Sequence, residues 1–508
     1  MTSLANQLRR LALPQTDQSL LMRKERASLL FDPKEAASLD GDFFHAIAGC
    51  TGLEELAGIE PAFDDFRDTL FSEASKRMER SVQSRDVNAR LDESIALFLA
   101  RLSPFFLLRP AHKCLEWLLY RFHIHQYNTE ALIGCVLPYH ETKVFVRVVQ
   151  LLKISEPTHR WHWLHPLQKP GVPLSRSTLV MHCYKDLGFM DFICGLVTHA
   201  VQVFGEQPSA ACQLRVLFSF YSSTLVAALE ADRVTDTVVA KLLPHVQKGL
   251  RSGLTDYWAS SLMLVAQLAV RATLEQSLAE TLTLQLVRSL ARRRRDAETR
   301  DGVACLIVLL QTQPSRTLKK KPFNCLCSLD GLLETLRELG ATHDTAPLLR
   351  AFLPPLVSAA LQPVLAPNDA DDDCNIADFG LLRTILLKFF SADREHAFVS
   401  CYSDRYTPQE REEGGASDGL AVLHQRLLPI LRTLEKRYTE SWDQVMAAHL
   451  HGESAGTGKE AFHDFISLGA ASGKHQLVPD SDTSLLLSLH HPQEAVRCLA
   501  LSHLCTLV

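Results

Sequence analysis

Apolar residues recur at helical spacing along most of this 508-residue chain, and this periodicity constrains the fold more than any other feature. Residues 241–270 show it most clearly, with two apolar stripes that each occupy one face of a helix. The first stripe consists of Leu242, Leu243, Val246 and Leu250. The second stripe consists of Trp258, Leu262, Val265, Leu268 and Ala269. Ser252 and Gly253 separate the stripes and Thr255 is suited to cap the second helix, so the segment predicts two antiparallel helices joined by a tight turn.

A short motif, in which apolar residues precede a proline, recurs at Pro138, Pro244, Pro354 and Pro429. The separations of 106, 110 and 75 residues are near three, three and two periods of about 37 residues, a length typical of helical solenoids. We interpret each proline as entering a helix, where its missing N–H is not needed. The motif therefore indicates that helix pairs repeat along the chain.

The last residues carry a more specific repeat signal. The segment HPQEAVR, residues 491–497, opens a helix and resembles the HEAT repeat, in which the residue equivalent to Arg497 commonly bonds to a neighbouring repeat. The predicted fold is therefore all-α, a HEAT/armadillo-like α-solenoid of antiparallel helix pairs. The sequence stops at Val508 without the second helix of that repeat, so we expect a solenoid truncated at its C-terminal end.

Four segments are expected along the chain. Residues 1–235 form an N-terminal helical-repeat region, and residues 236–365 form a HEAT-like helical domain. Residues 366–420 form an irregular, loop-rich insertion, because this segment gathers aspartates, prolines and glycines. Residues 421–508 continue as HEAT repeats that are cut off in the middle of a repeat.

The overall charge excludes a strongly basic nucleic-acid-binding protein. The net charge is −5 and the pI is about 6.5, so any RNA contact has to be local. The 13 cysteines are odd in number and irregularly spaced, which indicates reduced thiols in the cytosol or nucleus. The N-terminus lacks a secretory signal and no run of 18 apolar residues occurs, so no membrane contact is predicted.

No motif in the sequence predicts catalysis. The segment GESAGTGKE, residues 452–460, resembles a phosphate loop, but it has Glu453 where the first glycine is needed and Glu460 where a hydroxyl is needed. His123 and His125 point to different faces of a helix and suit joint metal ligation poorly. We therefore predict that the chain is not an enzyme and that it uses no cofactor, no metal and no small-molecule substrate.

Two basic runs are the candidate contact sites. One comprises Arg292, Arg293, Arg294 and Arg295, and the other comprises Lys319, Lys320 and Lys321. The arginines follow a predicted helix end, where they complement the helix dipole, so a solvated face explains them without any partner. The functional interpretation is contact with RNA phosphates or a protein partner, or a nuclear localisation signal. No aromatic residues are interleaved with either run, so base stacking has no support.

Several long stretches resemble one family. They are MTSLANQLRRLALPQ from Met1, LLFDPKEAASLD from Leu29, GCTGLEEL from Gly49, CLEWLLYRFHIHQYN from Cys114, CVLPYHETKVFVRVVQLLKI from Cys135, HCYKDLGFMDFIC from His182 and SDTSLLLSLHHP from Ser481. Together they look like the N-terminal region of the HEAT repeat-containing protein 1 family, very large scaffolds associated with the U-three small nucleolar RNA. The resemblance covers essentially the whole chain, and residues 236–365 resemble the family's named N-terminal domain.

The resemblance implies a structural role in the nucleus and nucleolus. Members belong to the small-subunit processome, which processes pre-rRNA toward small-subunit rRNA, and to a subcomplex that supports ribosomal DNA transcription by RNA polymerase I. The implied partners are WD-propeller subunits of that subcomplex, with pre-rRNA and small nucleolar RNA bound directly or through partners. The family has no catalytic residues to carry over. The alternative is a HEAT-type nuclear transport receptor or general protein-binding adaptor, which would bind the Ran GTPase or nuclear-pore repeats.

Overall fold

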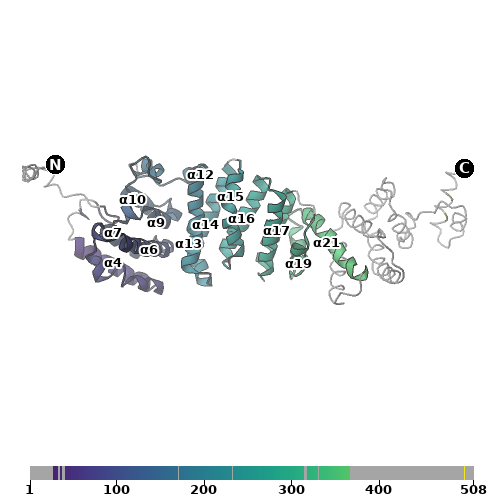
Figure 1. The fold of residues 1–508 in the computed structure, drawn as a ribbon, viewed down its shortest axis with the longest axis horizontal. Coiled ribbons are helices and arrows are strands. Elements are labelled where there is room, and N and C mark those ends of the chain that lie inside the picture. The colour runs from purple at the N-terminus through teal and green to yellow at the C-terminus, as the bar shows by residue number, and fades with distance from the viewer. Residues whose placement is uncertain are drawn as a thin grey trace, which may run out of the picture. The chain divides into compact units, whose positions relative to one another are not determined.

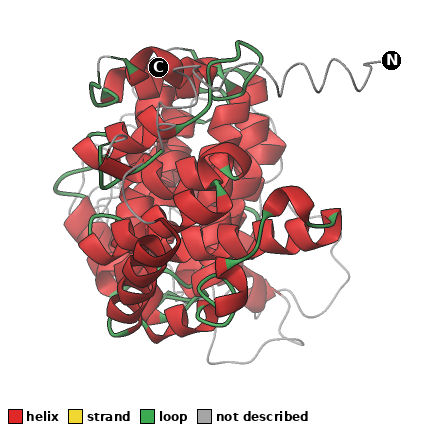
Figure 2. Cartoon of the chain, turned by 90° about the vertical axis from the view of Figure 1, so that its left-hand side faces the viewer, coloured by secondary structure: helices red, strands yellow, loops and turns green. Residues whose placement is uncertain are grey.

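The computed structural model describes residues 27–32, 35–36, 41–169, 171–231, 233–293, 295–313, 317–329 and 331–365, together with Arg497 and Leu501. Within these ranges the regular elements are α-helices and short 3-10 helices, and no strand occurs (Figure 2). The all-α prediction is confirmed. The segments 366–420 and 421–508, the phosphate-loop-like segment and Pro429 lie outside the described residues, apart from Arg497 and Leu501, which are helical.

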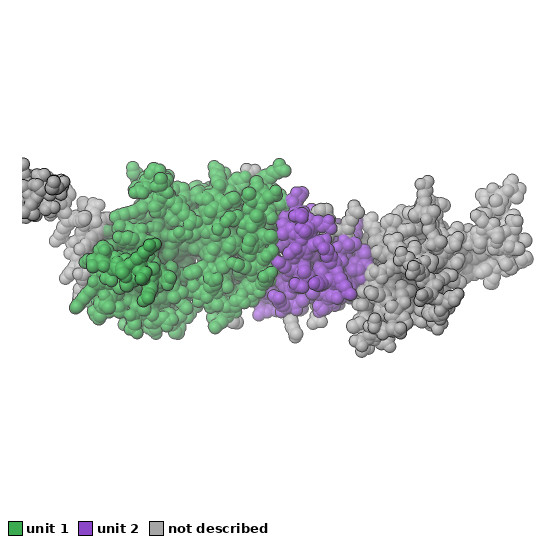
Figure 3. Space-filling model, viewed as in Figure 1, with its two compact units in different colours: residues 1–272 green, residues 273–508 purple. Residues whose placement is uncertain are grey.

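The described residues form two compact units, divided between Ala272 and Thr273 (Figure 3). This division falls inside the segment 236–365 that the sequence suggested as one domain. The boundaries proposed at 235/236 and 365/366 therefore stay predictions about domain organisation, distinct from the packing units that the structure shows.

Unit 1 is built from helices of alternating direction. Its elements are α4 (Gly41–Ala57), η1 (Pro61–Phe66), α5 (Glu73–Lys76), η2 (Arg80–Val82), α6 (Arg85–Leu102), η3 (Ser103–Phe105), α7 (Arg109–Phe122), α8 (Ile124–Tyr127), α9 (Thr129–Val136), η4 (Leu137–Tyr139), α10 (Lys143–Leu151), η5 (His162–Leu164), α11 (His165–Gln168), α12 (Arg176–Lys185), α13 (Leu187–Phe204), α14 (Pro208–Ala231), α15 (Asp236–Arg251) and α16 (Thr255–Arg271). Helix α13 packs on both α6 and α15, while α14 packs on both α12 and α16 (Figure 1). Two parallel layers of stacked helices result, which is the packing of a HEAT-like α-solenoid.

The predicted hairpin at residues 241–270 is confirmed as α15 and α16, which pack against each other. The apolar stripes form its core, and Trp258 is 1% exposed. Two details were wrong. Thr255 is the first helical residue and Leu254 holds the capping position, with its N–H donated to Ser252 Oγ at 3.2 Å. Pro244 lies inside α15 rather than at its start, because the buried stripe on both sides of it outweighs the lost backbone hydrogen bond.

The other two described prolines of the recurring motif differ in position as well. Pro138 lies in the short 3-10 helix η4 at the end of α9, and Pro354 lies within α21. The interpretation of these prolines as helix-entering residues was therefore wrong for Pro244 and Pro354. At these three positions the motif lies within helical segments, but it does not identify the first turn of an α-helix.

Unit 2 repeats the same kind of packing in a smaller set of helices. Its elements are α17 (Gln276–Ala291), α18 (Asp296–Thr312), α19 (Lys320–Cys327), α20 (Leu332–Leu339) and α21 (Ala346–Leu365). Helices α17 and α18 pack as a hairpin, α19 packs on α17, and both α20 and α21 pack on α18. Gly302 allows the hairpin to close, because a Cβ at this position would lie 2.3 Å from Leu290 Cδ2.

Two helices of unit 1 are long and apolar enough to cross a membrane, judged by length and composition alone. They are α13, with 33% of the tested residues buried, and residues 209–231 of α14, with 56% buried. Core helices of soluble proteins share these properties, and α14 packs against α12, α13 and α16. The absence of a membrane contact stays a prediction.

Candidate nucleic-acid interface

The arginine run forms the turn between α17 and α18. Arg292 follows the last residue of α17, and the N–H of Arg293 is donated to Leu290 O at 2.9 Å. Arg295 immediately precedes Asp296, the first residue of α18. Arg294 lies outside the described residues. Arg292 and Arg293 therefore sit at the C-terminal end of α17, where they complement the helix dipole, whereas Arg295 sits at the N-terminal end of α18, where it does not.

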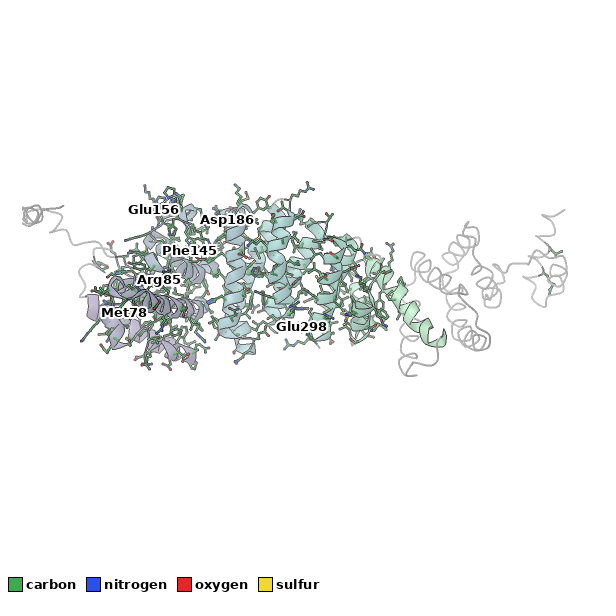
Figure 4. All side chains as sticks on the ribbon, viewed as in Figure 1. Met78, Arg85, Phe145, Glu156, Asp186 and Glu298 are labelled. Carbon is green, nitrogen blue, oxygen red and sulfur yellow. The ribbon has the colours of Figure 1, made fainter. Side chains whose placement is uncertain are left out.

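The described arginines divide into one buried and two exposed side chains. Arg293 is only 10% exposed, and its Nη1 lies 3.3 Å from Oε1 of Glu298, which is 11% exposed. Glu298 stands in the first turn of α18, where Figure 4 labels it. Arg295 is 79% exposed and lies 3.8 Å from the same carboxylate, and Arg292 is also exposed. Arg293 thus holds the hairpin together, whereas Arg292 and Arg295 are accessible to a ligand.

The lysine run opens α19. Lys319 precedes the helix, and Lys320 and Lys321 are its first two residues, all three exposed. Lys319 Nζ lies 2.5 Å from Glu280 Oε2 of α17. The hydrogen bond from Lys319 lowers the pKa of Glu280 below its ordinary value. Lys320 and Lys321 are left at the positive end of the helix dipole with no acidic residue in the first turn, which is unfavourable unless an anion is nearby.

An open pocket lies beside these lysines. Its volume is about 400 Å³, and it is lined by Glu280, Thr281, Thr283, Leu284 and residues 317–322. The lining includes all three lysines and only one acidic residue, which Lys319 already engages. The chemistry of this pocket suits a phosphate group.

The structure does not bring the two basic runs together. Lys319 contacts Glu280 near the start of α17, whereas Arg292 follows the end of the same helix. The 12 residue steps from Glu280 to Arg292 correspond to about 18 Å along the helix axis. The runs therefore form two separate contact points on unit 2 rather than one patch.

The remaining candidates from the sequence have structural explanations. His125 is buried, and burial lowers its pKa to about 4, while His123 adopts a left-handed conformation between α7 and α8. Among the residues that the structure describes, no group of three His, Cys, Asp or Glu side chains is arranged to hold a metal ion. The sequence analysis missed one further feature, a groove between α6, α9 and α13. No sequence signal indicates it, because its small residues Ala96, Ala131 and Gly195 lie on three helices that are distant in sequence.

Known proteins that are similar in sequence to this chain include HEAT-repeat proteins, in agreement with its helical-repeat architecture. Residues 238–356 match the family model described as U3 small nucleolar RNA-associated protein 10, a range that includes both basic runs. The chain is 50% identical over 509 residues to HEAT repeat-containing protein 1 of Danio rerio and 49% identical over 505 residues to that of Homo sapiens. Each alignment covers 99% of this chain. A U3 small nucleolar RNA-associated protein 10 of Aspergillus oryzae is 30% identical over 362 residues, or 68% of the chain.

The relatives are much longer than this sequence. The chain spans 23% of the length of the fish and human proteins and 20% of the fungal one. The high identity to the animal proteins extends through both units and beyond the described residues. With its helical-repeat packing and these matches, the chain belongs to the HEAT repeat-containing protein 1 family and corresponds to the N-terminal region of its longer relatives.

Proposed function

We propose that this chain is a non-enzymatic scaffold in ribosome biogenesis. It acts in the small-subunit processome of the nucleolus, supporting pre-rRNA processing toward small-subunit rRNA and ribosomal DNA transcription by RNA polymerase I. The observation that carries the proposal is the match of residues 238–356 to a U3 small nucleolar RNA-associated family. Stacked helix pairs support it physically, because they offer long surfaces that hold several partners without any reactive group.

The proposed partners are WD-propeller subunits of the processome, with pre-rRNA and small nucleolar RNA. The acidic net charge favours protein as the main contact, with RNA held at local points. Of the seven basic residues singled out from the sequence, we assign RNA phosphate contact to Lys320 and Lys321 beside the open pocket. Arg292 and Arg295 form a second, weaker contact point.

Affinity purification of this 508-residue chain from nucleolar extract, with and without ribonuclease, tests the scaffold role. We expect WD-propeller processome proteins to remain bound after ribonuclease, as measured by mass spectrometry. Their loss on ribonuclease treatment would assign the bridging to RNA instead. Absence of processome proteins from both samples contradicts the proposal, and GTP-dependent retention of the Ran GTPase would support the transport alternative.

Reversing the charge of Lys320 and Lys321 to glutamate is expected to weaken binding to a U3 small nucleolar RNA transcript about tenfold. Each lost phosphate contact lowers the slope of log Kd against log salt by roughly 0.7, so the slope should fall by about 1.4. Fluorescence anisotropy at several salt concentrations measures both quantities. The matched control reverses Lys169 and Lys185, which are exposed in unit 1. Equal weakening by the control would show a general charge effect and no site.

A further inference from the structure

An open groove lies in unit 1 between α6, α9 and α13, three helices that pack beside one another (Figure 1). Its volume is about 630 Å³. It continues into a smaller cavity of about 80 Å³, because Ala96, Ala131, Leu196 and His199 line both. Arg85 and Asp186, labelled in Figure 4, mark the start of α6 and the residue before α13. We call this feature the α6–α9–α13 groove.

The floor of the groove is apolar and made of small residues. Ala96 of α6 and Ala131 of α9 lie opposite Phe192, Gly195 and Leu196 of α13. A Cβ added to Gly195 would meet no atom within 4 Å, so space is open directly above this residue. The open part of the floor therefore lies at Gly195, while the Arg160 guanidinium lies 5.3 Å from the centre of the Phe192 ring.

Helix α13 borders the groove with one face. It is apolar enough to pass a length and composition test for a membrane span, and 33% of its residues are fully buried while most of the others are half-buried. Phe192, Leu196 and His199 follow one face of the helix at spacings of four and three, and all three line the groove. Phe192 and Leu196 are half-buried and His199 is exposed, so this face of α13 is partly accessible in the groove.

The rim of the groove is acidic. Asp92, Glu130 and Asp191 line it and are 44%, 58% and 45% exposed. Arg160 is the one Lys or Arg residue in the lining, and its Nη1 donates to Glu130 Oε1 at 2.6 Å. Asp92 holds Arg80, and Asp191 lies 3.4 Å from Lys241 and 3.3 Å from His245. Burial raises the pKa of Asp191, but hydrogen bonds from His245 and Lys241 outweigh burial and keep this pKa below its ordinary value.

We propose that the α6–α9–α13 groove docks an amphipathic helix of a partner protein, with the apolar stripe of that helix on the floor and its lysines or arginines along the acidic rim. The lining of α13 from Asp191 to His199 spans about 12 Å, which matches two turns of a bound helix. Recognition of this kind uses anchors at i, i+3, i+4 and i+7 for affinity and rim charges for orientation. The inference deepens the proposed scaffold role and rests on it for its biological setting.

Direct binding of defined peptides tests the groove. The probe is a fluorescein-labelled helical peptide of about 18 residues, with leucines at i, i+3, i+4 and i+7 and lysines on the opposite face. The matched peptide carries glutamates in place of the lysines. Fluorescence anisotropy with the full chain should show the lysine peptide binding at least tenfold more tightly than the glutamate peptide. Equal binding of both peptides overturns the proposal.

Two substitutions of Gly195 separate steric blocking of the groove from a general effect of replacing the glycine. Gly195→Leu fills the open space and should weaken binding of the lysine peptide at least tenfold, while Gly195→Ala, which adds one methyl group, should change it less than threefold. Both changes raise helix propensity, so neither should unfold α13. Glu130→Lys should weaken binding about fivefold, because it places a cation on the rim. An unchanged affinity in Gly195→Leu contradicts the proposal.

The same variants distinguish other occupants. Vesicles of phosphatidylcholine and phosphatidylserine that bind the chain and lose binding with Gly195→Leu, without any peptide effect, would make the groove a membrane surface and overturn the proposal. Self-association abolished by Gly195→Leu, measured by sedimentation, would make the occupant a second copy and overturn it too. If processome proteins fail to purify with the wild-type chain while the peptide result holds, the scaffold role fails and the groove stands.

Discussion

Replacing Arg293 with alanine is expected to destabilise the α17–α18 hairpin by about 3 kcal/mol, whereas replacing Arg292 should change its stability by less than about 0.5 kcal/mol. Both residues belong to the same run of four arginines. Arg293 is 10% exposed and pairs with Glu298, itself 11% exposed, so its loss removes the nearer of the two arginines from a largely buried carboxylate. Arg292 is exposed at the helix end and loses only a favourable interaction with the helix dipole.

Native-state hydrogen exchange followed by mass spectrometry measures this difference. A chain of two units does not unfold in one step, so a global melting curve mixes their stabilities. Exchange of amides in α17 and α18 should accelerate roughly 100-fold in Arg293→Ala and stay unchanged in Arg292→Ala. Equal acceleration in both variants would contradict the division of the run into a structural and an accessible part.

The distinction has a consequence for RNA-binding experiments. Reversing all four arginines together destabilises the hairpin as well as removing accessible cations, and the two effects give the same loss of binding. Reversing Arg292 alone removes an exposed cation and leaves Arg293 and Arg295 beside Glu298. A binding loss in this single variant therefore reports on contact with a ligand.

The helical architecture could be predicted from the sequence because helices bury apolar residues that recur at a regular spacing. The stripe of Leu242, Val246 and Leu250 is readable from residue types, and burial of that stripe stabilises the α15–α16 pairing. Pro244 shows the limit of local signals. A proline favours a helix start when judged alone, but the packing of residues on both sides extends α15 through it.

The candidate site could be predicted only as a set of residue types. Four adjacent arginines look alike in the sequence, and what separates Arg293 from its neighbours is the turn that places it against Glu298 of the next helix. The separation of the two basic runs along α17 likewise follows from α19 packing near its start. The groove could not be predicted, since Asp92, Glu130 and Asp191 are distant in sequence and meet only through helix stacking.

Replacing Glu116 with alanine is expected to release residues 28–31 from unit 1. Glu116 of α7 is 1% exposed, and its two oxygens accept hydrogen bonds from Ser28 Oγ at 2.6 Å, from the N–H of Leu29 at 2.7 Å and from the N–H of Leu30 at 3.1 Å. Removing the carboxylate leaves the Leu29 donor buried without this acceptor, at a cost of about 1–3 kcal/mol for each such group. We expect a local destabilisation of about 3–4 kcal/mol in total.

A second side chain, Arg147, holds the same turn, and Glu93 provides a control substitution elsewhere in unit 1. Arg147 of α10 donates from Nη2 to Ser28 O at 3.1 Å and to Phe31 O at 3.0 Å. Amide exchange at residues 28–31 should accelerate at least 100-fold in Glu116→Ala and hardly at all in Glu93→Ala, which removes an exposed carboxylate of α6. Once Glu116→Ala has released the turn, adding Arg147→Ala should accelerate exchange little further, because both side chains act on one segment. Full additivity of the two variants would show that the turn stays bound without Glu116, and that Glu116 does not anchor it.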